Sequence, residues 1–91
     1  MDQSPQLGRV VFSTAGRDAG RFYLIVEIVD SVFVKIADGD QRRIDSPKLK
    51  KIKHLRFQHE VFDKIGDKLA EGKKVFDAEI KSALRNYNGS I

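Results

Sequence analysis

Hydrophobic and polar residues alternate along the first part of the chain in short runs that predict β-strands. The run RVVFS predicts a strand over Arg9–Ser13. The run FYLIVEIV is apolar on nearly both faces, so a strand over Phe22–Val29 is expected at the centre of a curled sheet or barrel. A third strand, Val32–Ala37, follows so closely that the two are expected to form a hairpin through Asp30-Ser31.

Turn-forming residues separate the next predicted strands. Asp38-Gly39 is typical of a two-residue type I′ turn, because both residue types tolerate positive φ angles. The turn leads to a fourth, short and polar strand over Gln41–Asp45, which Ser46-Pro47 ends, and Lys48–Phe57 is expected to supply one last strand. Short strands joined by tight turns, without the spacing of βαβ units, indicate a mainly β fold built as a small antiparallel barrel.

The apolar pattern changes to helical spacing after Phe57. Apolar residues then recur at intervals of three and four, which predicts an amphipathic helix over Glu60–Glu71, ended by Gly72. Gly66 lies inside this helix, where it is expected to cost about 0.5–1 kcal/mol relative to alanine.

A second helix is predicted over Ala78–Tyr87, with Asp77 as its N-cap. The apolar faces of both helices are expected to pack on the barrel and to cover one open end of it. The alternative is that one of these faces lies in the groove of a partner protein.

Composition indicates a single globular domain. The chain has 91 residues, of which 41% are hydrophobic and 33% charged, which suits one folded core. It contains no cysteine, which excludes a disulfide framework, a thiolate zinc site and a catalytic thiol. Residues 1–6 are polar and are expected to form a disordered tail. Because neither a signal-peptide pattern nor an apolar run of about 20 residues is seen, we expect a cytoplasmic protein.

Positive charge is concentrated in one segment of the chain. Residues 1–40 contain four Lys/Arg and six Asp/Glu, whereas residues 60–91 contain six of each. Residues 41–59 contain seven Lys/Arg and one Asp, a net charge of +6. Such a segment is typical of a polyanion partner such as a nucleic acid. The alternative is a solvated basic face without a partner.

Two stretches together resemble a known family. The stretch GRVVFSTAGRDAGRFYLIVEI resembles a KOW motif, with Gly20 in the place of the motif's glycine and alternating apolar residues around it. The stretch SPKLKKIKHL resembles a basic segment, ending in Lys-His-Leu, of the large-subunit ribosomal protein family L-fourteen-e, to which small bacterial stand-alone KOW proteins are related.

This resemblance covers about residues 7–57 and implies an SH3-like barrel that includes most of the basic segment 41–59. The helical extension, residues 58–91, adds little to it. The resemblance also implies a non-catalytic protein that binds structured ribosomal RNA and is associated with the ribosome, with ribosomal proteins as further partners.

The residue types in these stretches suit contacts with RNA phosphates. Glycines let the backbone approach a phosphate, arginines present forked donors, and lysines add point charges. The candidate RNA-binding residues are Arg9, Gly16, Arg17, Gly20, Arg21, Arg42, Arg43, Lys48, Lys50, Lys51, Lys53, His54 and Arg56. Phosphate contacts position a protein without reading bases, so recognition of RNA shape is expected.

Structural roles are the alternative for several of these residues. Gly20 suits a turn that needs positive φ, and Arg21 suits an ion pair with a carboxylate such as Asp18. Tyr23 and Phe33 can stack on bases, whereas their place in central strands favours burial in the core.

No pattern in the sequence indicates catalysis, a metal or a cofactor. Gly16 and Gly20 do not form a P-loop, because Arg21-Phe22 stands where a Lys-Ser/Thr pair is needed. His54 and His59 lack the neighbours of a metal site. The alternative to RNA binding is a protein-interaction module of the transcription or translation machinery, since a fold does not determine its function.

Overall fold

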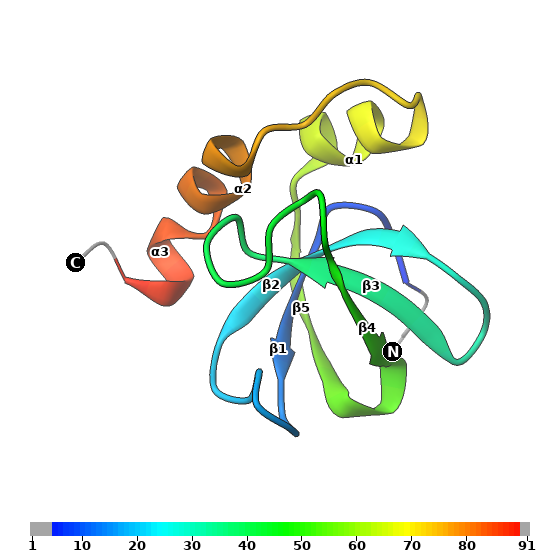
Figure 1. Ribbon diagram of the computed structural model, residues 1–91, viewed down its shortest axis with the longest axis vertical. Helices are drawn as coiled ribbons and strands as arrows, with labels where there is room; N and C mark the ends of the chain where they lie inside the picture. The colour runs from blue at the N-terminus through cyan, green and yellow to red at the C-terminus, as the bar shows by residue number, and fades with distance from the viewer. Residues whose placement is uncertain (1–4, 90–91) are drawn as a thin grey trace.

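The protein folds into a five-stranded antiparallel sheet followed by three short α-helices (Figure 1). The computed structural model describes residues 5–89, so the first four residues of the predicted tail lie outside the described residues. No helix within these residues has the length and apolar character needed to cross a membrane. The elements are β1 (Arg9–Ser13), β2 (Phe22–Ile28), β3 (Phe33–Ala37), β4 (Lys48–Lys51), the 3₁₀ helix η1 (Ile52–His54), β5 (Leu55–Val61), α1 (Asp63–Ala70), α2 (Asp77–Ala83) and α3 (Arg85–Asn88).

The sheet is strongly curled. Its strand order is β4-β3-β2-β1-β5, and every neighbouring pair is antiparallel. The edge strands β4 and β5 would be about 19 Å apart in a flat sheet, yet only η1, about 6 Å long as a 3₁₀ helix, joins them. The two edges therefore converge at η1 (Figure 1). Within residues 5–89 no ladder joins β4 to β5, so the predicted mainly β antiparallel fold with C-terminal helices is confirmed without a closed barrel.

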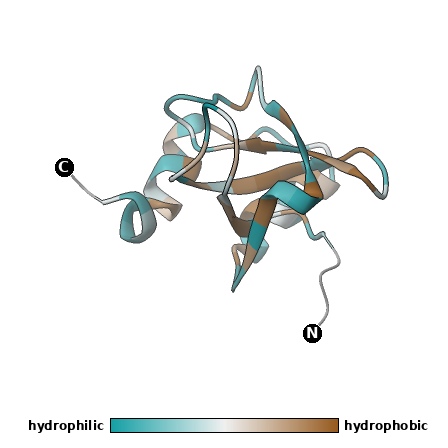
Figure 2. Cartoon of the chain, turned by 90° about the horizontal axis from the view of Figure 1, so that it is seen from below, coloured by the Kyte–Doolittle hydropathy of each residue, from teal (hydrophilic) through white to brown (hydrophobic). Residues whose placement is uncertain are grey.

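Each face of the sheet buries its own hydrophobic cluster. Residues of α1, α2 and α3 are absent from one cluster, so the curl of the sheet itself buries this inner face. The inner cluster consists of Val11, Tyr23, Ile25, Val34, Ile36 and Leu55. The outer cluster combines strand residues with residues from the helical extension, and consists of Val10, Leu24, Val26, Ala37, Ile65, Val75, Ile80 and Leu84. Figure 2 accordingly shows hydrophobic residues concentrated on the strands.

The helices cover the outer face of the sheet, not an open end as predicted. Leu24 and Val26 of β2 point away from the inner cluster and contact the buried residues of the helices. The near-continuous apolar sequence of β2 is explained by this arrangement, because the strand is buried on both faces. An apolar outer face has to be covered, and the two helical stripes do so.

The β3–β4 connection is a loop, and the predicted strand over Gln41–Asp45 is wrong. Gly39 has a φ of +80°, but no other residue type has a positive φ between residues 5 and 89, so Asp38-Gly39 does not form a type I′ turn. Instead, the N–H groups of both residues donate to the carbonyl of Arg42, at 2.9 and 3.1 Å. Ile44 then packs on the outer cluster. The loop is therefore held by the helices and not by a neighbouring strand.

The predicted last strand, Lys48–Phe57, is in fact two strands. β4 pairs with β3 at one edge, and β5 pairs with β1 at the other, with η1 between them. Because β5 continues to Val61, α1 begins at Asp63 and not at the predicted Glu60. The predicted helix over Ala78–Tyr87 is present as α2 and α3.

Asp77 is not the N-cap of α2. The N-cap is Phe76, whose N–H donates to the carboxylate of Glu79 at 3.0 Å. The carboxylate of Asp77 instead accepts the N–H of Ile44 at 2.7 Å. Asp77 therefore binds the β3–β4 loop instead of capping α2 as the local sequence had predicted.

Candidate nucleic-acid interface

The β1–β2 loop, residues 14–21, reverses the chain between two paired strands. Gly20 has a φ of +88°, and its N–H donates to the carbonyl of Ser13 at 2.9 Å. Gly16 has a φ of +79°, and its carbonyl accepts the N–H of Ala19 at 3.2 Å. Residues other than glycine rarely adopt such backbone angles, so both glycines are needed for the shape of this loop.

Asp18 anchors the loop from inside. Its side chain is 4% exposed, and its carboxylate accepts Nε of Arg42 at 2.9 Å and lies 3.7 Å from Nζ of Lys50. Nζ of Lys50 also donates to the carbonyl of Ala15 at 2.5 Å. The carboxylate thus ties the β1–β2 loop to the β3–β4 loop and to β4.

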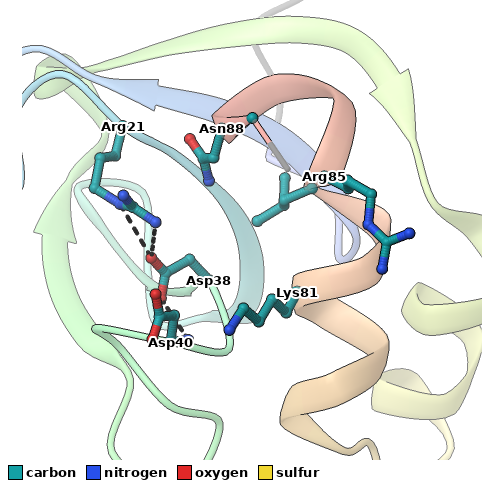
Figure 3. A pocket seen from close by; sticks show the side chains of 8 residues that line it. Arg21, Asp38, Asp40, Lys81, Arg85 and Asn88 are labelled. Atoms are coloured by element: carbon teal, nitrogen blue, oxygen red, sulfur yellow. Dashed lines mark hydrogen bonds and ion pairs between the residues drawn. The ribbon is translucent and has the colours of Figure 1, made fainter. Parts of the chain in front are cut away.

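Asp38 organises the neighbouring loop in the same way. One of its carboxylate oxygens accepts Nε and Nη2 of Arg21 at 3.3 and 3.1 Å, as Figure 3 shows. The other accepts the N–H groups of Asp40 and Arg42 at 3.0 and 2.8 Å. Because the side chain of Asp38 is completely buried, these bonds supply the partners that a desolvated carboxylate requires.

Arg9 fastens β1 to β5. Its Nη1 donates to the carbonyls of Gln58 and His59 at 2.8 and 3.3 Å, and its Nη2 donates to the side chain of Gln6.

Four of the candidate RNA-binding residues thus have partners within the protein, and these are Arg9, Arg21, Arg42 and Lys50.

The other candidate cations are open to solvent or half-buried. Lys48 and His54 are half-buried. Five are exposed and make no ion pair with any residue from 5 to 89, and these are Arg17, Arg43, Lys51, Lys53 and Arg56.

Three of the exposed cations lie at one end of the sheet. The N–H and Oγ1 of Thr14 both donate to the carbonyl of His54 at 2.9 Å, which holds the β1–β2 loop against η1. Figure 1 shows both segments at the bottom of the view. We call Arg17, Lys53 and Arg56 the basic end of the sheet. The loop and the basic segment, about thirty residues apart in the sequence, thus meet here.

The aromatic candidates differ in exposure. Tyr23 is fully buried, and its hydroxyl donates to the carbonyl of Asp18 at 3.4 Å, so it belongs to the core and supports the loop. Phe33 is half-buried at the start of β3.

Asp18 was named from the sequence as a partner of Arg21, but it pairs with Arg42 and Lys50, and Arg21 pairs with Asp38. The role of Asp38 was missed, since burial of a carboxylate leaves no local signal.

A cavity of about 250 Å³ lies between the Arg21–Asp38 pair and helices α2 and α3 (Figure 3). In this view the ammonium group of Lys81 points towards Asp38, whereas the guanidinium group of Arg85 points away. Arg21 lines this cavity, and its guanidinium group is paired there with the carboxylate of Asp38. Lys81 and Arg85 line the same cavity and bring positive charge close to Arg21. They do so although residues 60–91 contain equal numbers of acidic and basic residues.

No metal centre is apparent in the part of the chain that the structure describes, because no three His, Asp or Glu side chains come together as ligands. No protein-family model and no curated protein matches this chain. The function is therefore inferred from the arrangement of the residues of this chain.

The pKa values of Tyr23 and Tyr87 are both raised above 10, the ordinary pKa of a tyrosine hydroxyl. The hydroxyl of Tyr87 donates to Glu60 at 2.6 Å, and this hydrogen bond raises the pKa of Tyr87 to about 12. Burial raises the pKa of Tyr23. Each contribution to stability is present below pH 10 and is lost as the pH rises through the folded-state pKa.

An alkaline absorbance titration of the phenolates, compared with that of Tyr87→Phe, measures both values. A tyrosine that ionises near pH 10 while the protein is still folded would contradict this assignment.

Proposed function

We propose that this protein is a non-catalytic RNA-binding protein that binds structured ribosomal RNA and is associated with the ribosome. The observation that best supports this function is the basic end, where Arg17, Lys53 and Arg56 are exposed and lack ion-pair partners among the described residues. Cations without counter-charges are suited to phosphates, because contact with RNA releases the counterions of the phosphates.

The buried carboxylates beneath the loop support the same function. Asp18 and Asp38 pair with Arg21, Arg42 and Lys50 and so hold the β1–β2 loop against the β3–β4 loop and β4. A loop that is already ordered loses little conformational entropy on binding, so more of the contact energy is kept as affinity. The internal ion pairs thus serve to present Arg17.

An SH3-like barrel of the KOW type is our finer description of the fold. The curl of the sheet, with η1 joining its two edge strands, supports it. The strand–loop–strand unit from β1 to β2 then corresponds to the KOW motif, with Gly20 as its glycine.

Binding to a structured ribosomal RNA fragment is expected to fall steeply with salt. Several neutralised phosphates give a slope of log K against log salt of roughly −3 to −5. The triple substitution Arg17→Ala, Lys53→Ala and Arg56→Ala is expected to make this slope about two to three units less steep, because three phosphate contacts are lost. Fluorescence anisotropy over a salt series measures both quantities.

The matched control removes three exposed lysines from the opposite side of the molecule. Lys64, Lys73 and Lys74 lie on α1 and in the α1–α2 connection, at the top of Figure 1. Their substitution by alanine changes the net charge equally and is expected to preserve most of the slope. Binding that is independent of salt, or no tighter than to a scrambled RNA, would sink the proposal. Lys50 is left intact because its ammonium group is buried against Ala15 and Asp18.

A protein-interaction module is the second candidate function, and one surface favours it. The helices do not supply that surface, since Ile65, Ile80 and Leu84 are buried. The tip of the β2–β3 hairpin does, because Ile28, Val29 and Val32 are 43%, 45% and 49% exposed. Recovery of the same protein partners after nuclease treatment, and their loss on Val29→Ser with Val32→Ser, would favour this candidate over RNA binding.

A further inference from the structure

Among the strand residues, Phe33 and Phe12 are the two aromatic side chains that belong to neither hydrophobic cluster, and of these two only Phe12 contacts another ring. It lies in β1 on the outer face, directly opposite Phe22 of β2, and the two ring centroids are 4.8 Å apart. It is half-buried, and it belongs to neither hydrophobic cluster. Phe12 therefore rests on one aromatic neighbour and keeps part of its surface open to solvent.

The ring beneath Phe12 is held rigidly. Phe22 contacts Tyr87 of α3 at a centroid distance of 5.1 Å. The side-chain amide of Asn88 accepts the N–H of Phe22 at 2.8 Å and donates to its carbonyl at 2.9 Å. Tyr87 is fixed in turn by its hydrogen bond to Glu60. The outer face thus supports Phe12 with a row of rings that needs no rearrangement to receive a flat ligand.

Arg56 lies on the other side of Phe12. The two residues are directly opposite in the β1–β5 ladder, so their side chains share one face at a Cβ separation of about 5 Å. Arg56 is exposed and has no ion-pair partner among residues 5–89. An open aromatic ring beside an unpaired guanidinium group combines the two features with which proteins bind single-stranded nucleic acid, a stacking surface and a phosphate donor.

We infer that Phe12 stacks on an unpaired base of the bound RNA while Arg56 binds a neighbouring phosphate. This inference rests on the proposed RNA-binding function and specifies the kind of RNA. A base within a continuous A-form duplex keeps both faces stacked on its neighbours, whereas a loop or bulge presents an open face. The site therefore requires a single-stranded nucleotide next to a helical segment, whose phosphates meet Arg17 and Lys53.

Tryptophan at position 12 gives a direct readout, because the chain contains no other tryptophan. Phe12→Trp is expected to bind an RNA hairpin carrying a single-nucleotide bulge with quenching of its fluorescence. A fully paired duplex with the same number of phosphates is expected to bind with little quenching. The control is Phe76→Trp, since Phe76 is 57% exposed and also lies beside a cation, Lys74.

Affinity provides the second readout. Phe12→Leu keeps an apolar side chain but removes the ring, and it is expected to weaken binding to the bulged hairpin about tenfold while leaving duplex binding unchanged. Phe12→Tyr keeps the ring and is expected to retain wild-type affinity. Phe76→Leu is the matched control and is expected to change neither affinity. Thermal unfolding of each variant verifies that it is folded.

The outcomes separate this inference from the proposed function. If wild-type protein binds RNA with the expected salt slope but Phe12→Leu and Phe76→Leu bind the bulged hairpin equally, stacking on Phe12 is overturned and RNA binding stands. Equal quenching of Phe12→Trp by hairpin and duplex overturns it in the same way. If wild-type protein binds neither RNA in a salt-dependent manner, both proposals fail.

Discussion

Substitution of Asp38 by alanine is expected to lower the free energy of unfolding by about 3 kcal/mol, towards the lower end of the range for breaking a buried ion pair. The carboxylate is fully buried, and its loss leaves the backbone N–H groups of Asp40 and Arg42 without an acceptor. The cost stays at that end because Arg21 is 32% exposed and regains water when its partner is removed. Urea unfolding followed by circular dichroism measures the change.

Asp45→Ala is the matched control for Asp38→Ala. Asp45 is an exposed carboxylate of the same loop, and its removal is expected to change stability by no more than about 0.5 kcal/mol. Asp38→Asn is expected to fall between the two, because an amide still accepts hydrogen bonds but does not neutralise Arg21. Equal stabilities for Asp38→Ala and Asp45→Ala would show that Asp38 does not organise the two loops.

Substitution of Gly66 by alanine is expected to destabilise the protein by about 3 kcal/mol, as overpacking against backbone does. Helix propensity alone predicts the opposite, a gain of about 0.5–1 kcal/mol. Gly66 faces the segment of Leu7 and Gly8, and a Cβ at Gly66 would overlap the carbonyl oxygen of Leu7. The segment cannot retreat easily, because the N–H of Gly8 donates to Ile25 at 2.8 Å and its carbonyl accepts from Phe62 at 2.9 Å.

Ala70→Gly in the same helix isolates the propensity effect. Ala70 is exposed, so its replacement by glycine is expected to cost about 1 kcal/mol, the ordinary difference between the two residues in a helix. Chemical denaturation of both variants gives the comparison. A Gly66→Ala protein more stable than wild type would show that helix α1 does not need this close approach.

Prediction from sequence succeeded where the structure follows a local sequence signal. β1 was predicted at Arg9–Ser13 with its observed bounds, and β2 and β3 differ from their predictions by one residue at one end. Each of these strands is an apolar run bounded by turn residues, which is a property of the strand's own sequence, and each is paired with a neighbour on both sides. The turn glycine Gly20 is likewise a local requirement.

Prediction failed where a distant contact outweighs local preference. Gln41–Asp45 alternates weakly, but Asp38 binds the backbone of Arg42 and Ile44 packs on the helices, so the segment becomes a loop. Asp77 is a good local N-cap, but its carboxylate bonds to Ile44 of that loop. The contacts of Ile44 decide both cases, because its side chain packs on the helices and its N–H donates to the carboxylate of Asp77, 33 residues away in the sequence.

The basic segment shows what each level of structure decides. The sequence alone determined that positive charge is concentrated in residues 41–59, next to a predicted sheet, with no cysteine chemistry available. The tertiary structure decided which of these charges face outwards. Lys50 and Lys53 are the same residue type three positions apart, yet Lys50 is 7% exposed against Asp18, whereas Lys53 is exposed on η1. Burial and charge neutralisation depend on residues brought together by the curl of the sheet, and no local pattern records them.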